Sequence, residues 1–188
     1  MMERMAVAVA TALALAGSAG AEPRISPGDV LSAIDGRWNR DALLERAVLV
    51  EGELDSADLY LFATMDGPRD MALVATGRGI VWSGALYGTL PRLERAENGS
   101  LRLLSQNTAI GRHRWEQVLT IAHRGGAYVV AGFSYAAFDT LDPTAETSCD
   151  VNLLTGLGIR DGKTVQVPAA AVPVSAWTDD AAPQVCFD

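Results

Sequence analysis

The sequence predicts a mainly β protein, an antiparallel meander or sandwich-like roll that carries a short amino-terminal helix. Short runs rich in β-branched and aromatic residues recur along the chain, and glycine-containing turns separate them. Removal of a predicted export signal leaves 188 − 21 = 167 residues, which is enough for one domain around one core. We therefore expect a signal peptide at 1–21 and a single β-rich domain at 22–188.

The first residues have the composition of a cleavable export signal. Arg4 gives a positive start, an apolar run extends from Met5 to Ala16, and Ala19-Gly20-Ala21 fits the small-residue cleavage pattern. This run is too short to span a bilayer as a helix, and no later segment is long without charged residues. The predicted location is the periplasm or the cell exterior, with no transmembrane segment in the mature chain.

The net charge of the chain bears on its partners. The formal charge is −8 at pH 7. A net acidic surface repels the phosphate backbone, so we expect no general nucleic-acid binding.

The two cysteines of the chain, Cys149 and Cys186, both lie in the part predicted to be exported. Pairing is the default in an oxidising compartment, and closing such a loop stabilises the fold by about 4 kcal/mol in the chain-entropy treatment. Two free buried thiols are the alternative. A zinc site is disfavoured because the cysteines, His113 and His123 show no metal-ligand spacing. We expect no metal and no cofactor.

The region from Ser26 to Asp29 has the features of a helix start. Ser26 can cap, proline suits the first helical position and Asp29 completes a capping box. Val30, Leu31 and Ile34 would share one side of the helix, and Gly36 would end it.

The pattern then changes to that of consecutive antiparallel strands. The clearest hairpin turns are Asn98-Gly99, Gly125-Gly126 and Asp161-Gly162, and both residues of the first are expected to adopt positive φ. Pro168 and Pro173 disfavour a further central strand, so the tail is expected to be an edge strand or an extended loop. The predicted strands are 47–50, 59–64, 71–75, 79–82, 92–95, 100–104, 115–123, 127–135, 151–159 and 164–167.

The segment from Arg37 to Val50 resembles a degenerate loop and strand of the FG-GAP or VCBS type repeat. In that family a loop of the approximate pattern DxNxDGxxD precedes an apolar strand and binds calcium through alternate oxygens. Here Arg37 stands at the first ligand position and Ala42 at the glycine position. A cation at the first position repels calcium, so we expect a solvated turn before a strand. The partial ligand set would be Asn39, Asp41 and Glu45.

A second stretch, from Asn98 to Gly156, is similar to uncharacterised exported bacterial proteins. It contains GSL at 99–101, GRxRW at 111–115 and the Asn-Leu-Leu-Thr-Gly motif at 152–156. The resemblance implies a periplasmic or secreted location and assigns no reaction. Asn152 and Thr155 could present donors to a ligand, or they could cap a turn, and we favour the turn.

One basic and aromatic segment is the candidate for a contact surface: Arg112, His113, Arg114 and Trp115. A guanidinium group beside an aromatic ring suits a carboxylate, a phosphate or an acidic partner. The alternative, which we favour, is that Trp115 enters the core while Arg112 and Arg114 solvate the strand entrance and pair with carboxylates.

Catalytic patterns are weak. The sequence has no GxSxG motif; Gly132 to Ala136 comes near it, but with alanine at the last position and in a predicted hairpin strand. Carboxylate pairs such as Asp139 with Asp142 lie in predicted loops. We therefore expect no catalytic residues, and a non-enzymatic periplasmic or secreted binding module for an envelope protein or an anionic wall component. The alternative is a small cell-envelope hydrolase.

Overall fold

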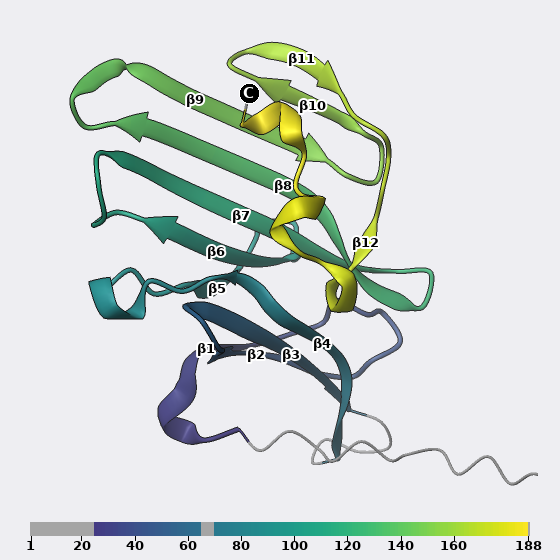
Figure 1. Ribbon diagram of the computed structural model, residues 1–188. Coiled ribbons are helices and arrows are strands. Elements are labelled where there is room, and N and C mark those ends of the chain that lie inside the picture. Colours follow the sequence, from purple (N-terminus) through teal and green to yellow (C-terminus); the bar gives the residue numbers. More distant parts are fainter. Residues whose placement is uncertain (1–24, 65–69, 188) are drawn as a thin grey trace, which may run out of the picture.

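The computed structural model describes residues 25–64 and 70–187, which form two antiparallel sheets (Figure 1). The mainly β, antiparallel prediction is confirmed. The predicted signal peptide at 1–21 lies outside the described residues. Among the residues described, no helix is long and apolar enough to cross a membrane.

Within each sheet the main strands pair in chain order, so both sheets are meanders. The small sheet has the order β1 (Val30–Gly36), β2 (Glu45–Glu51), β3 (Ser56–Thr64) and β4 (Met71–Trp82). The large sheet runs in reverse order from β11 to β5, and β12 (Val172–Pro173) pairs with one end of β8. Its strands are β5 (Arg92–Arg95), β6 (Leu101–Asn107), β7 (His113–Arg124), β8 (Ala127–Asp139), β9 (Asp142–Asn152), β10 (Leu157–Arg160) and β11 (Lys163–Gln166).

The predicted amino-terminal helix is wrong. A single 3₁₀ turn, η1 (Pro27–Asp29), leads directly into strand β1. The pairing of β1 with β2 shifts register between Val30 and Ser32. Such a bulge changes the side-chain alternation, so Leu31 and Ile34 both pack against the core although they are three positions apart. That spacing imitates the period of a helix.

The main core lies between the sheets. It combines fully buried side chains of the small sheet, such as Leu49 and Leu59, with Leu119 and Phe133 of the large sheet. Trp177 from the carboxyl-terminal tail, 2% exposed, completes it. A second, smaller cluster around Tyr60 lies apart from this core.

The hairpin turns follow local glycine chemistry. Gly125 and Gly126 both have positive φ, 58° and 82°, as a two-residue turn requires. In the turn before β6, by contrast, only Gly99 has positive φ (84°), so the expectation for Asn98 is wrong. The Gly99 N–H donates to the Ala96 carbonyl and the Ala96 N–H to the Ser100 carbonyl, the pattern of a type I turn with a bulge.

The predicted strand over 151–159 is divided by a turn. β9 ends at Asn152 and β10 begins at Leu157. The Asn152 side-chain oxygen accepts hydrogen bonds from the N–H groups of Leu154 and Thr155. Asn152 thus caps a turn, which is the role we favoured from the sequence.

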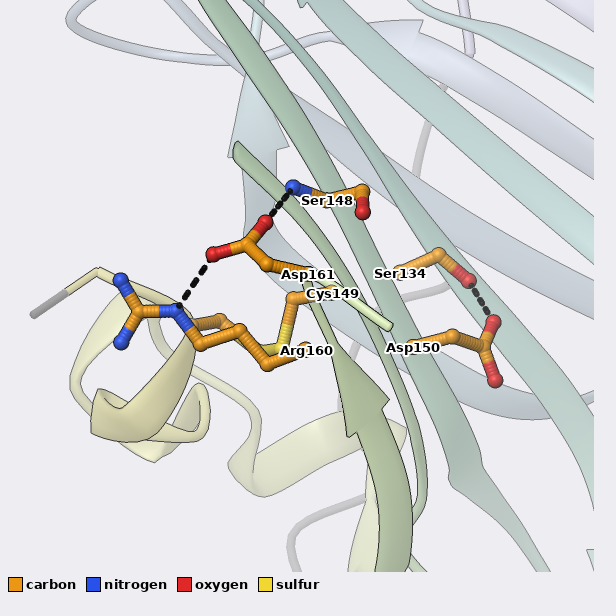
Figure 2. The surroundings of a disulfide bond; sticks show 7 residues. Ser134, Ser148, Cys149, Asp150, Arg160 and Asp161 are labelled. Carbon is orange, nitrogen blue, oxygen red and sulfur yellow. Dashed lines mark hydrogen bonds and ion pairs between the residues drawn. A yellow bond between two sulfur atoms is a disulfide. The ribbon is translucent and has the colours of Figure 1, made fainter. Parts of the chain in front are cut away.

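Cys149 and Cys186 form a disulfide, as predicted (Figure 2). Both cysteines are buried, and the bond closes a loop with a sequence separation of 37. The tail that it holds is an extended loop and a short strand only as far as β12, as expected. After the short β12 it forms three 3₁₀ turns, η3 (Val174–Ala176), η4 (Asp179–Ala181) and η5 (Gln184–Cys186).

A buried carboxylate connects the two sheets. Glu45 at the start of β2 is completely buried and accepts hydrogen bonds from the backbone N–H groups of Trp38 and Asn39. The Tyr128 hydroxyl on β8 donates to its other oxygen. Burial, with the hydrogen bond to Glu45, raises the pKa of the Tyr128 phenol well above its usual value. The Glu45 carboxylate therefore fixes both the 37–44 loop and the position of β8.

Tyr128→Phe is expected to lower the free energy of unfolding by about 1.5–3 kcal/mol, because a buried carboxylate loses a donor. Chemical denaturation measures this difference. Tyr87→Phe is the matched control, since Tyr87 is 53% exposed. Equal stability of Tyr128→Phe and the control would contradict the role assigned to Glu45.

Candidate binding site

Strand alternation separates the side chains of the candidate segment. Arg114 and Glu116 of β7 face one side of the large sheet, and Trp115 and Gln117 face the other. We call the Arg114 side the outer face, because the core residue Leu119 belongs to the opposite side. Arg112 and His113 precede these residues at the entrance of β7.

The register of the long strands builds two rows on the outer face. Arg114 pairs with Phe138, and Phe138 pairs in turn with Glu146 of β9. In the next row, Ala136 lies between Glu116 and Ser148. Because Ala136 is the smallest side chain of these rows, the sheet is hollowed over it.

This hollow, the outer groove, has a volume of about 570 Å³. A second cavity of about 380 Å³ adjoins it and shares Glu116, Ala136 and Ser148. The two together form an elongated depression across β6 to β10. The residues that define the outer groove are Arg114, Glu116, Ala136, Phe138, Glu146 and Asp161.

Three charged groups of the outer groove lack a partner within the part of the chain that the structure describes. The Nη1 atom of Arg114 is buried and makes no hydrogen bond there. Glu116 and Glu146 form no ion pair among the same residues. A buried donor without an acceptor is costly, by about 1–3 kcal/mol. The groove therefore suits a ligand that offers an acceptor to Arg114 and donors to the carboxylates.

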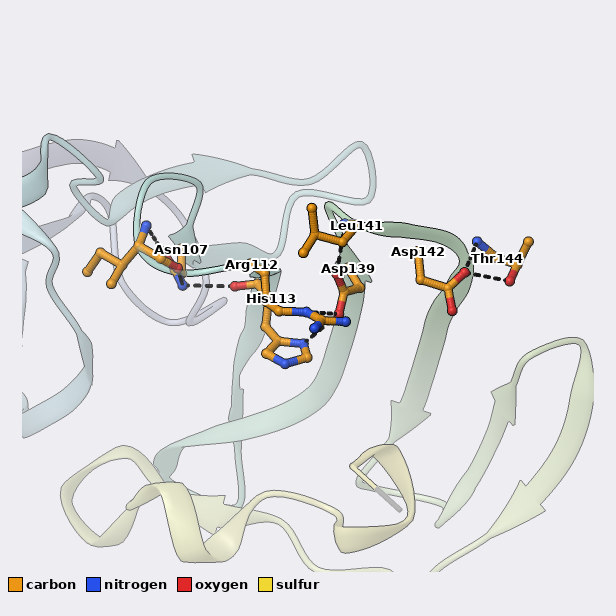
Figure 3. Close-up of polar contacts among 8 residues, drawn as sticks. Asn107, Arg112, His113, Asp139, Leu141, Asp142 and Thr144 are labelled. Atoms are coloured by element: carbon orange, nitrogen blue, oxygen red, sulfur yellow. Dashed lines mark hydrogen bonds and ion pairs between the residues drawn. The ribbon is translucent and has the colours of Figure 1, made fainter.

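Arg112 and His113 are oriented toward an internal carboxylate instead (Figure 3). Arg112 Nε lies 2.6 Å from Asp139 Oδ2, and His113 Nδ1 lies 3.6 Å from the same oxygen. The Leu141 N–H donates to Asp139 Oδ1 at 2.8 Å. The Leu141 hydrogen bond and then the Arg112 guanidinium hold the pKa of Asp139 below its usual value. Pairing with carboxylates is what the favoured sequence interpretation predicts for Arg112.

Asn107 organises the loop that leads into β7 (Figure 3). Its side-chain oxygen accepts hydrogen bonds from the N–H groups of Ala109 and Ile110. Its amide nitrogen donates to the carbonyls of Ile110 and His113. The loop is therefore a defined wall beside the outer groove, where Thr108 is part of the lining.

Trp115 lies at the junction of the two faces. It takes part in the lining of the outer groove, and its ring lies 5.5 Å from the ring of Trp82 at the end of β4. The four candidate residues thus have three different surroundings: Asp139 for Arg112 and His113, the outer groove for Arg114, and Trp82 for Trp115.

In the 37–45 loop, side-chain oxygens of Asn39 and Glu45 accept hydrogen bonds from backbone N–H groups of the chain itself. Asn39 Oδ1 accepts from the Asp41 N–H at 3.0 Å, and the Glu45 carboxylate is buried as described above. Among the described residues, no group of three or more His, Cys, Asp or Glu side chains could hold a metal ion.

The serines and histidines do not meet in the described part of the chain. Ser134, the residue of the near-GxSxG segment, donates to Asp150 Oδ2 at 2.6 Å (Figure 2). The ring centroids of His123 and Tyr128 lie 4.9 Å apart, and His113 lies near Asp139. The hydrolase alternative therefore finds no serine–histidine pair among the described residues.

The chain matches no family model, and it shows no significant similarity to a curated protein or to a solved structure. The site must therefore be judged from its geometry. Sequence reasoning missed Glu116, Phe138 and Glu146, which join Arg114 in the groove. The available signal was the period-2 pattern of β7, which separates Arg114 from Trp115 and places Glu116 beside Arg114.

Arg112→Ala is expected to raise the pKa of Asp139 while leaving it below the usual value, because the Leu141 hydrogen bond remains. NMR titration of the Asp139 carboxyl carbon measures this pKa. Arg124→Ala, which removes a guanidinium bonded to the His123 carbonyl, is the matched control and should leave Asp139 unchanged. An unchanged Asp139 pKa in Arg112→Ala would show that Arg112 is free for a ligand.

Proposed function

We propose that this protein is a non-enzymatic binding module of the periplasm or the cell exterior, and that the outer groove holds an extended segment of a partner protein. The observation that carries the proposal is Arg114, which lines the groove, forms no ion pair among the described residues and has a buried Nη1 atom without an acceptor there. A peptide carbonyl or a carboxylate of the partner supplies that acceptor.

The charges of the groove favour a protein partner over an anionic wall component. Glu116, Glu146 and Asp161 line the groove together with the single arginine, Arg114, of its described lining. Asp161 lies 3.5 Å from Arg160 Nε, but Glu116 and Glu146 form no ion pair among the described residues. These two carboxylates repel a polyanion, whereas a polypeptide offers N–H donors and basic side chains to them and carbonyls to Arg114. The elongated shape, about 570 Å³ with an adjoining 380 Å³, suits an extended chain.

The proposed location rests on three supports. The buried disulfide is typical of proteins that fold in an oxidising compartment. The export-signal composition of residues 1–21 and the resemblance to exported bacterial proteins point to the same compartments.

A pull-down from periplasmic extract and from culture medium tests the proposal. Wild type and Arg124→Ala should retain the same specific protein, and Arg114→Ala should lose it. Loss of a charge-assisted hydrogen bond weakens affinity about tenfold or more. Titration calorimetry with the purified partner then measures the change in Kd.

Two outcomes would contradict the proposal. One is a partner that Arg114→Ala retains as well as wild type does. The other is release of soluble fragments from purified envelope material by the wild-type protein, which would favour the hydrolase.

A further inference from the structure

The inner face of the large sheet carries an unexpected polar row. Ser105, Gln117, Tyr135 and Cys149 are consecutive register partners across β6, β7, β8 and β9. The row two positions further toward the core is entirely apolar: Leu103, Leu119, Phe133 and Val151. Ser105 and Cys149 at the two ends of this row are buried, whereas Gln117 and Tyr135 between them are only partly buried on a face that otherwise forms the core.

A cleft of about 370 Å³ lies over this row. Trp82 from the end of the small sheet forms one wall, and its carbonyl accepts a hydrogen bond from the Ser105 hydroxyl at 2.6 Å. The carboxyl-terminal tail forms the other wall with Asp179 and Phe187. The side chains that define the cleft are Trp82, Trp115, Gln117, Tyr135, Asp179 and Phe187.

Aromatic rings surround the cleft from several elements. The rings of Trp82 and Trp115 lie 5.5 Å apart at an interplanar angle of 58°. Tyr135 and Phe187 form an edge-to-face pair at 4.9 Å. Both ring pairs are tilted and not stacked in parallel, so ring faces and ring edges both line the cleft.

The charge of the cleft is negative and comes from one aspartate. Asp179 is the charged residue of the described lining, and it forms no ion pair among the described residues. Burial, together with the charge of Asp180, raises the pKa of the Asp179 carboxyl. A carboxylate in these surroundings is stabilised by a cation, and the negative faces of aromatic rings attract a cation as well.

We propose that this aromatic cleft binds an organic cation, with an alkylammonium group held against the Trp82, Trp115 and Tyr135 rings and beside the Asp179 carboxylate. The Gln117 side chain, which makes no hydrogen bond within the described residues, offers its carbonyl to an N–H or O–H group of the same ligand. The cleft lies on the face opposite Arg114, so the inference does not depend on the proposed function.

The test is a titration of the oxidised protein with choline, followed by tryptophan fluorescence. Choline is expected to quench the emission of Trp82 and Trp115 at saturable concentrations. Its uncharged isostere, in which a tert-butyl group replaces the trimethylammonium group, should bind about tenfold more weakly or not at all. Asp179→Asn should weaken choline binding to a similar extent. Glu97→Gln is the matched control, because it removes one negative charge from an exposed residue, and it should leave choline binding unchanged.

Several results would overturn the inference. Equal affinity for choline and its isostere would show a merely apolar cleft. Binding of N-acetylglucosamine without binding of choline would show a site for neutral sugars. Unchanged choline affinity in Asp179→Asn, or no saturable quenching of the wild-type protein, would also contradict it.

Discussion

The bond between Cys149 and Cys186 ties the carboxyl-terminal tail to β9 of the large sheet, and the position of the tail depends on it. The tail consists of three-residue 3₁₀ turns, which are too short to be stable alone. Yet η3 contacts β4 and β8, and η5 contacts β9 (Figure 1). Trp177 is part of the main core. Closing this loop removes about 4 kcal/mol of chain entropy from the unfolded state. The disulfide thus holds the tail against the core, a position that the short 3₁₀ turns could not maintain alone.

The long strands β7 and β8 serve two surfaces at once. Their alternating side chains form an apolar inner face and a mixed-charge outer face. Both faces are hollowed near residues 114–117, at the start of β7. Ala136 opens the outer face because it is small, whereas on the inner face Gln117 stands where an apolar side chain would close the core. One segment, Arg114 to Gln117, therefore contributes to both the outer groove and the aromatic cleft.

Features that depend on local chemistry could be predicted from the sequence. The turn at Gly125-Gly126 follows from backbone freedom, and the disulfide follows from the inferred compartment. Features that depend on register could not. The bulge in β1 lets Leu31 and Ile34 both pack against the core, although their spacing in the sequence is that of a helix. Asp139, the partner of Arg112, is 27 residues away in sequence, and Glu146 reaches the same surface as Arg114 only through the pairing of three strands.

Hydrogen–deuterium exchange of the oxidised and the reduced protein tests the central role of the disulfide most directly. The N–H groups of Ala181, Ala182, Cys186 and Phe187 are hydrogen-bonded within the tail turns. Reduction is expected to speed their exchange by on the order of a hundredfold, while the amides of β2 and β3 change much less. Equal protection of the tail in the two forms would contradict this account, because other contacts would then be sufficient to hold the tail in place.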